Sequence, residues 1–348
     1  MSRSRESRRK EKKKRVQKHQ KRTLQSDRVR QGRIQKTEVH AESEWNTDQE
    51  PALPPRFEME RIMRDLHRFL DEHEITSDEQ MKMLVEQFNR SSGDRLKGRR
   101  GSLDDREVAQ DLAYQAMEAE DAEEAIALVD EALSLDPDCV DALVCRAMAL
   151  SRSPRQWIMN LKAAVRAGKR VLGREFIEEN KGHFWGIFET RPYMRAKQAL
   201  ADVYRKLGRF PEAIAEYESM LELNPNDNQG VRDSLIGCYL VERDLDGARR
   251  LFDRYKCDFS AVYSWGRVLE RFLTEDKPGT TRALRKARKC NPHVERFLTG
   301  RAHVPRSLPD YYKPGDVTEA FHCMDNLAEA WKRHPKAIAW LKAQAGGS

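Results

Sequence analysis

The chain has 348 residues, of which 35% are charged, and a formal net charge of +7. This length suffices for one large or two average domains with a buried core. No run of 18 apolar residues occurs, which excludes an ordinary transmembrane helix, and no apolar secretory segment opens the chain. The six cysteines form no C-x-x-C pair, so we expect reduced, mostly buried thiols rather than disulfides or a zinc site.

The first 36 residues differ sharply from the rest of the chain in charge. They contain 16 Lys or Arg and 3 Asp or Glu, a formal charge of +13, whereas the remainder has 48 basic and 54 acidic side chains, or −6. Because so few apolar residues cannot offset the entropy lost on ordering, we expect 1–55 to be a disordered basic tail and linker.

This basic tail has more than one interpretation. It can bind nucleic acid non-specifically through phosphates, although no aromatic residue is interleaved in 1–36 for base stacking. It can equally be a solvated extension, and an Arg-rich presequence is a third reading. We expect a cytoplasmic location, or a nuclear one if the source is eukaryotic, since basic runs of this kind also resemble nuclear localisation signals.

Two amphipathic segments follow the linker. Residues 57–73 are predicted to form a helix with one apolar stripe, made of Phe57, Ile62, Leu66, Phe69 and Leu70. A second helix is predicted after a capping box of Ser77 and Gln80. Residues 90–102 lack an apolar period, so we interpret 56–102 as a helical pair followed by a second linker.

From residue 103 onward a two-helix pattern recurs. Its clearest copy, LADVYRKLGRFPEAIAEYESMLELNP (200–225), has a large aromatic at Tyr204, a turn glycine at Gly208, a small residue at Ala213 and a final Pro225. Further copies follow the same frame at 113–137, 141–172, 234–255 and 261–292. The pattern resembles the tetratricopeptide repeat, whose hairpins must stack to bury their apolar faces. We predict an all-α, tetratricopeptide-like helical-hairpin solenoid with a C-terminal cap over 103–345.

The order of the motifs extends this resemblance over about residues 56–345. AQDLAYQAMEAED, LSLDPDCVDALV, GHFWGIFETRPYMRA and LNPNDNQGVRDSL together look like a widespread group of bacterial tetratricopeptide-repeat proteins. NPHVERFL, PGDVTEAF and AWKRHPKAIAWL, in the C-terminal part, are similar to the eukaryotic suppressor of tumorigenicity 7 family. The resemblance implies a helical repeat scaffold and implies no reaction.

The stretch GHFWGIFETRPYMRA (182–196) departs from the Ala-, Leu-, Glu- and Lys-rich composition around it. Its distinctive side chains are those of His183, Trp185, Phe188, Arg191 and Tyr193. Such a cluster is typical of a catalytic pocket, a ligand clamp or a buried hinge between helical units. Pro192 suits the first turn of a helix with Thr190 as its N-cap, which leaves Phe184, Trp185 and Phe188 to bury on the preceding turn. We interpret the stretch as a structural corner, with a ligand patch as the alternative.

Motifs for chemistry are missing from the sequence. Neither phosphate-binding glycine loop occurs, nor do G-x-S-x-G and H-E-x-x-H. The scattered His293, His303, His322 and Cys323 would meet at a metal only in a fold that the sequence does not predict. We therefore expect no enzymatic activity, no metal and no cofactor, and an enzyme with an unrecognised site at Trp185–Tyr193 is the weakest alternative.

Stacked hairpins favour binding, because their first helices line a concave groove. Repeat positions two, five, nine and twelve of the clearest unit predict an exposed groove face made of Arg195, Gln198, Asp202 and Arg205. The family's carboxylate clamp has Lys and Asn where this chain has Gln198 and Asp202, so a receptor for peptide C-termini is not expected. Asn228 and Arg232 are further groove candidates, although a capped polar loop explains them as well.

These observations predict a non-enzymatic scaffold that binds a protein or peptide segment in its groove and does not enter a membrane. A nucleic-acid- or ribosome-associated adaptor that acts through the basic tail is the alternative. Near the C-terminus, the Pro- and Tyr-rich connector 303–316 is expected to cover the apolar face of the last repeat.

Overall fold

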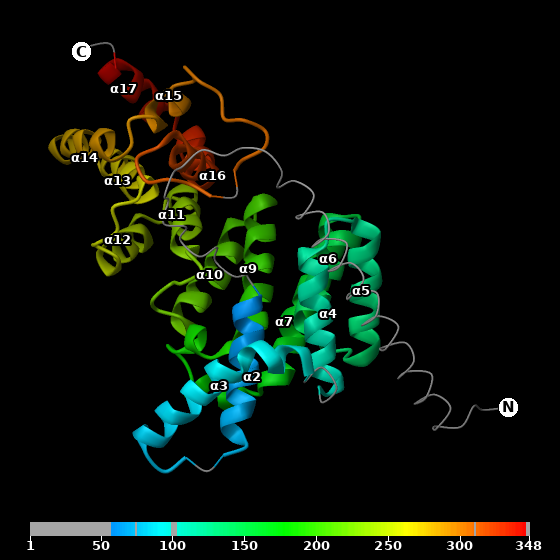
Figure 1. Ribbon diagram of the computed structural model, residues 1–348. Coiled ribbons are helices and arrows are strands. Elements are labelled where there is room, and N and C mark those ends of the chain that lie inside the picture. The colour runs from blue at the N-terminus through cyan, green and yellow to red at the C-terminus, as the bar shows by residue number, and fades with distance from the viewer. Residues whose placement is uncertain (1–56, 74, 99–102, 310, 346–348) are drawn as a thin grey trace, which may run out of the picture. The chain divides into compact units, whose positions relative to one another are not determined.

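A computed structural model of the chain describes residues 57–73, 75–98, 103–309 and 311–345 (Figure 1). All regular structure in these ranges is helical, which confirms the prediction of an all-α solenoid of tetratricopeptide-like hairpins. The predicted tail and linker, 1–55, lie outside the described residues. No helix in the described ranges is long and apolar enough to cross a membrane.

The first two helices of the described part of the chain form a pair with its own small apolar core. α2 (Glu58–Asp71) and α3 (Asp78–Gly98) together bury Phe69, Leu84 and Phe88. The rest of the predicted stripe packs around these rings, apart from Phe57, which turns toward another helix. This core is separate from the two apolar clusters that lie within the repeats.

The structure changes two details of this pair. The N–H of Gln80 donates to the hydroxyl of Ser77 at 3.2 Å as predicted, but the Gln80 side chain accepts from the N–H of Thr76 instead of closing the capping box. The linker predicted over 90–102 is wrong as far as residue 98, because α3 continues to Gly98. A polar segment without proline can extend a helix even though it has no apolar period.

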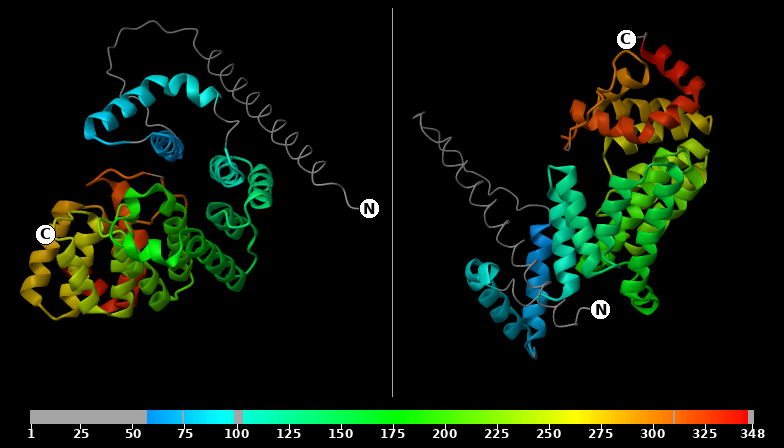
Figure 2. Two further views of the ribbon diagram at one scale, coloured as in Figure 1. Left: turned by 90° about the horizontal axis from the view of Figure 1, so that it is seen from below. Right: turned by 90° about the vertical axis from the view of Figure 1, so that its right-hand side faces the viewer.

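Successive helical hairpins follow, side by side in the order of the chain (Figures 1 and 2). Their first helices are α4 (Asp105–Glu118), α6 (Val140–Leu150), α9 (Arg191–Lys206), α11 (Val231–Glu242) and α13 (Ala261–Leu273). Their second helices are α5 (Ala122–Leu135), α7 (Pro154–Leu172), α10 (Phe210–Leu223), α12 (Leu245–Arg254) and α14 (Lys277–Cys290). Each first helix packs against its own second helix.

The hairpin of α9 and α10 shows why these residues fold in this way. Gly208 has φ +71° in the turn, a conformation that costs glycine little. Tyr204 and Tyr217 are buried, and Ala213 is fully buried where only a small side chain allows the helices to approach. Pro225 follows the end of α10, as the repeat pattern predicts.

A corner of short helices joins α7 to α9. It contains α8 (Arg174–Glu179) and the 3-10 turns η2 (Phe184–Gly186) and η3 (Phe188–Thr190). α9 begins at Arg191, as predicted from Pro192. The N–H of Gly182 donates to the carbonyl of Leu223 at 3.1 Å, which ties the corner to the end of α10.

The C-terminal helices are α15 (Val294–Leu298), α16 (Val317–Arg333) and α17 (Pro335–Ala345). α16 and α17 both pack against α13, and the rings of Phe272 and Trp340 lie 5.5 Å apart. The expectation that the connector 303–316 covers the last repeat is therefore wrong, since its described side chains are mostly exposed and helices take that place. All six cysteines are unpaired, and Cys139, Cys238 and Cys323 are buried.

Candidate functional site

The candidate binding surface is formed by side chains of the first helices, and we call it the first-helix face. Its members are Asp111 and Tyr114 on α4, Asp141 on α6, Arg195, Gln198 and Arg205 on α9, and Asp233 and Ser234 on α11. Among the described residues, two further helices lie on this face. α2 contacts α4 and α9, whereas α16 contacts α9, α11 and α13.

Glu60 is the centre of the contact made by α2, and only 7% of it is exposed. Its carboxylate accepts hydrogen bonds from Nη1 of Arg195 at 2.8 and 3.1 Å and from the hydroxyl of Tyr114 at 2.7 Å. One turn earlier, the ring of Phe57 stacks on that of Tyr114 with centroids 4.7 Å apart. Burial alone would raise the pKa of Glu60, but the guanidinium of Arg195 holds it below its ordinary value.

Arg195 lies between two carboxylates. Its Nε and Nη2 donate to Asp141 at 2.9 and 2.5 Å, while Nη1 points to Glu60. Asp141 is fully buried and also accepts from Gln110 at 2.7 Å. Burial would lower the pKa of Arg195, but the charges of Asp141 and Glu60 raise it, so the guanidinium stays charged.

The same side of α2 carries basic residues that meet the acidic side chains of α4. Arg64 donates to Asp111 at 2.8 Å, and Nε of Arg61 lies 3.6 Å from the same carboxylate. Arg68 pairs with Glu107. Phe57, Glu60, Arg61, Arg64 and Arg68 therefore share one helical side, opposite the apolar stripe that packs on α3. The spacing of the apolar residues alone does not reveal this side, because its members are mostly charged.

The predicted groove residues are not the exposed face that we expected. Arg195, Gln198, Asp202 and Arg205 are all only partly exposed. Gln198 accepts from Gln229 at 2.8 Å, Asp202 accepts from Tyr217 of the second helix at 2.5 Å, and Arg205 donates to Asp325 of α16 at 2.9 Å. The repeat frame gives positions on a helix, and it does not tell which other helices of the chain cover them.

The two candidates near α11 differ from each other. Asn228 is exposed. Arg232 is partly buried between two carboxylates, with Nη1 3.0 Å from Asp227 and Nε 2.7 Å from Asp258. Asp227 also accepts from the N–H of Val231, so this loop does cap α11. The capped-loop interpretation therefore accounts for Arg232, and Asn228 is the candidate left open to a partner.

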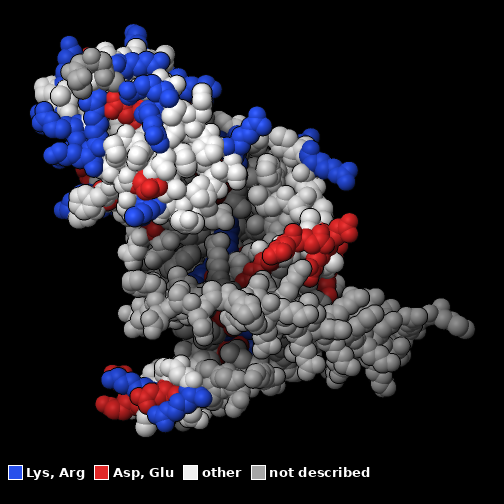
Figure 3. Space-filling view, turned by 45° about the horizontal axis from the view of Figure 1, so that its top comes forward, with Lys and Arg blue, Asp and Glu red and all other residues white. Residues whose placement is uncertain are grey.

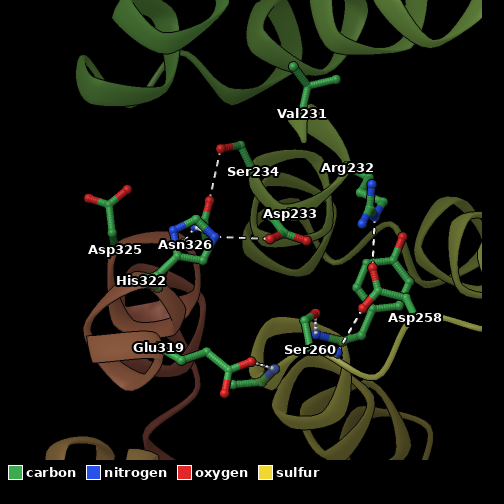
Figure 4. A network of polar contacts seen from close by, with 12 residues as sticks. Val231, Arg232, Asp233, Ser234, Asp258, Ser260, Glu319, His322, Asp325 and Asn326 are labelled. Carbon is green, nitrogen blue, oxygen red and sulfur yellow. Dashed lines mark hydrogen bonds and ion pairs between the residues drawn. The ribbon is translucent and has the colours of Figure 1, made fainter. Parts of the chain in front are cut away.

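The contact of α16 with α11 is close and polar at its centre (Figure 4). Nε2 of His322 lies 3.0 Å from Asp233, and the hydroxyl of Ser234 donates to Asn326 at 2.8 Å. A Cβ at Gly237 would lie 2.1 Å from the carbonyl oxygen of Asn326, so only glycine permits this approach. At its N-terminal end, α16 uses Glu319 to accept from the N–H of Ala261 at 2.9 Å.

Apolar packing joins α16 to the main core of the repeats. The fully buried side chains that it contributes to that core are Ala320, Cys323, Leu327, Ala330 and Trp331. The indole of Trp331 makes an edge contact with that of Trp265 in α13, with centroids 6.5 Å apart. α16 thus shares the main core of the repeats, whereas the apolar side of α2 belongs to a separate cluster.

The corner at 182–196 separates buried from half-exposed aromatic side chains. Phe184 and Tyr193 are buried, whereas Trp185 and Phe188 are partly exposed and His183 is exposed. Of the three aromatic residues predicted to bury on this turn, Phe184 does so, whereas the prediction is wrong for Trp185 and Phe188, which stay partly exposed. Whether the outer part of the corner binds a ligand stays a prediction.

Arg191 and Thr190 hold the outer side of this corner. The guanidinium of Arg191 lies 3.9 Å from the ring centroid of Phe188 and 4.7 Å from that of Trp185. The hydroxyl of Thr190 donates to the carbonyl of Ile187 at 2.7 Å. It makes no capping hydrogen bond to α9, so the prediction of Thr190 as the capping side chain is wrong. Pro192 has no N–H to offer at the second position of the helix, which removes one of the usual partners of a capping side chain.

A second charged surface lies on α14. Its exposed basic side chains follow one helical stripe, made of Arg282, Arg285, Lys286 and Lys289, and the helix contains no acidic residue. Lys and Arg side chains gather at the end of the molecule that carries α14 (Figure 3). In the part of the chain that the structure describes, no group of three or more His, Cys, Asp or Glu could hold a metal ion.

Comparison with known proteins identifies one unit of the chain. Residues 195–227 match the tetratricopeptide repeat family, so the chain contains such a repeat where α9 and α10 form their hairpin. None of the curated proteins is similar to the chain. A solved structure described as the functional characterization of Pseudomonas aeruginosa pilF is 17% identical over 53% of this chain and 91% of that chain, with a TM-score of 0.29. A similarity that low supports no argument about function.

Proposed function

We propose that the protein is a non-enzymatic, cytoplasmic scaffold that binds a peptide or protein segment on its first-helix face. The tetratricopeptide repeat at 195–227 supports a role in protein interactions. The observation that carries the proposal is the contact of α2 with the first helices, where Arg195 and Tyr114 donate hydrogen bonds to the buried carboxylate of Glu60. A face that binds one helix in this way has the donors needed to recognise a segment of a partner.

The stretch of the face between the two covering helices leads to an exposed side chain, Asn228. Gln198 lies on α9 between Arg195, which contacts α2, and Arg205, which contacts α16. Its partner Gln229 is adjacent to the exposed Asn228. A partner that reaches the first-helix face therefore passes within reach of Asn228.

A photoreactive amino acid at position 228 of the full chain tests this proposal. We expect illumination in native lysate to give a defined cross-linked protein from position 228. Position 222 is the matched control, because Glu222 is exposed on the second helix α10. Equal products from both positions, or none from position 228, would contradict binding at the first-helix face.

The proposed organisation follows the function. Residues 1–55 are the basic tail and linker, 56–102 the helical pair with its connection, and 103–345 the repeat solenoid with its C-terminal cap. The similarities to a bacterial group of repeat proteins and to the suppressor of tumorigenicity 7 family stay predictions, and neither adds a reaction to the proposal.

The second candidate is an adaptor that binds nucleic acid. Besides the +13 charge of residues 1–36, the exposed stripe on α14 favours it, because four cations at helical spacing can follow a phosphate backbone. RNA affinity should then fall steeply between about 50 and 200 mM salt. A chain without residues 1–36 and one with Gln at positions 282, 285, 286 and 289 distinguish the tail from α14. Binding that neither change weakens would contradict this candidate.

A further inference from the structure

We propose that the part of the first-helix face formed by α4, α6 and α9 is a receptor for an amphipathic helix that carries an aromatic residue and, three positions later, a carboxylate. α2 is the chain's own occupant of this receptor, and a partner helix replaces it. The inference rests on the proposed function, since it names the class of partner for the same surface.

The receptor is organised by residues that do not belong to α2. Asp141 of α6 binds Nε and Nη2 of Arg195, which fixes the guanidinium and leaves Nη1 directed at the position of the ligand carboxylate. The hydroxyl of Tyr114 is the second donor to that carboxylate, and its ring is the surface on which the aromatic residue stacks. Nη1 of Arg191 lies 3.5 Å from the same carboxylate and adds a longer contact. Donors that are already fixed cost little further ordering when a ligand arrives.

The departure of α2 leaves the buried charges of the receptor paired. Arg195 keeps both hydrogen bonds to Asp141, and Asp141 keeps Gln110. Removing one partner of a buried ion pair is costly because it leaves an uncompensated charge, and this cost is avoided here. The apolar side of α2 stays packed on α3 in their own cluster, so it too is not exposed by the exchange.

The polar side of α2 shows which helices fit. Counted from Phe57, its carboxylate stands at +3 and its basic residues stand at +4, +7 and +11. The carboxylate faces Arg195 of α9, whereas the basic residues face Asp111 and Glu107 of α4. This arrangement selects an internal helical segment rather than a chain terminus, because contacts lie on both sides of the carboxylate. Reversed charges at these positions would oppose binding.

Competition between α2 and an added copy of its sequence tests the proposal. The probe is a fluorescein-labelled peptide of residues 55–90, which contains α2 and the part of α3 that completes their apolar core. The receptors are the full chain and a full chain with Phe57→Ala and Glu60→Gln, which weaken α2 in place. We expect the peptide to bind the double variant at least about 10-fold tighter, because α2 no longer competes at full strength.

Changes to the peptide and to the receptor separate specific from general binding. A Glu60→Gln peptide should bind the double variant about 10-fold more weakly, since it loses a charge-assisted hydrogen bond. Tyr114→Phe in the receptor removes one donor, keeps the ring and should weaken the peptide several-fold. Arg250→Gln, an exposed change on α12, should have no effect.

Equal binding to both receptors, or indifference to the carboxylate of the peptide, would overturn the inference. These results are independent of the cross-linking at position 228. A partner captured there with no exchange of the peptide would leave the scaffold function standing and remove the proposed helix receptor. Peptide exchange without any captured partner would support the helix receptor and contradict the proposed binding of a partner near Asn228.

Discussion

Two helices cover the first-helix face, and they do so with different physical means. α16 contributes five fully buried side chains to the main core and approaches α11 so closely that position 237 must be glycine. α2 faces the repeats with one stacked ring, one buried carboxylate and a row of arginines, while its apolar side packs on α3. Burial of apolar surface fixes a helix on its domain, whereas a helix held mainly by ion pairs can dissociate and bind again. The C-terminal part of the face is therefore permanently covered, and the N-terminal part is covered by a replaceable helix.

The largest expected effect on stability comes from α16, because its apolar side chains belong to the main core and those of α2 do not. Trp331→Ala in α16 should lower the free energy of unfolding by about 3–5 kcal/mol, because the indole is fully buried in the main core. Phe57→Ala in α2 should leave the main unfolding transition near that of the wild type, since the change frees α2 only. Thermal melts of both variants check this, and a large loss for Phe57→Ala would show that α2 belongs to the main core.

A change on the receptor should cost more than the matching change on α2. Arg195→Ala is expected to cost about 3 kcal/mol, because the fully buried Asp141 then has no countercharge. Glu60→Ala should cost far less in the main transition, since Arg195 keeps Asp141. Denaturant unfolding of the two variants gives the comparison. Equal losses would mean that Glu60 is as integral to the repeats as Asp141.

The close approach of α16 to α11 at Gly237 is the next feature to test. Gly237→Ala should destabilise the protein by about 2 kcal/mol, because the new Cβ would lie 2.1 Å from the carbonyl oxygen of Asn326 and α16 must move. Gly186→Ala is a suitable control, since a Cβ there meets nothing within 4 Å. If both glycines tolerate alanine equally, the contact between α11 and α16 is looser than described.

Acid should release α2 with the smallest effect on the rest of the protein. The pKa of Glu60 is lowered from its ordinary value of 4.5, so its contact with Arg195 is fully present above that pH and is lost as the pH falls through the lower value. Limited digestion with an acid-active protease should cleave within α2 and α3 increasingly below pH 4.5. A Glu60→Gln variant should lose this dependence on pH, and a wild-type pattern in that variant would contradict the assignment.

The sequence predicted the hairpins well because their small and aromatic residues recur at a fixed spacing. Ala213, Tyr217 and Gly208 have the buried or turn positions that the repeat implies. The covering of the repeats was not predictable in the same way. Contacts such as Glu60 with Arg195 join residues 135 positions apart, and a repeat frame holds no information about them.

Arg195 and Arg205 are less exposed than their repeat positions predict, because those positions carry no information about the helices α2 and α16 that cover them. Phe184 is buried as predicted but Trp185 and Phe188 are not, because the sequence does not show which side of a 3-10 turn faces inward. The sequence does hold a charge pattern in α2, since Glu60, Arg61, Arg64 and Arg68 follow the helical period as clearly as the apolar stripe does.

Hydrogen exchange of the full chain in low and high salt tests the central claim most directly. We predict that the amides of α2 exchange at least about 100-fold faster than those of α16, because α2 opens locally while α16 opens only with the main core. Raising the salt from about 0.05 to 1 M should speed exchange in α2 further and leave α16 unchanged, since screening weakens partly exposed ion pairs far more than apolar packing. Equal protection of the two helices, or no response of α2 to salt, would contradict a replaceable helix on the first-helix face.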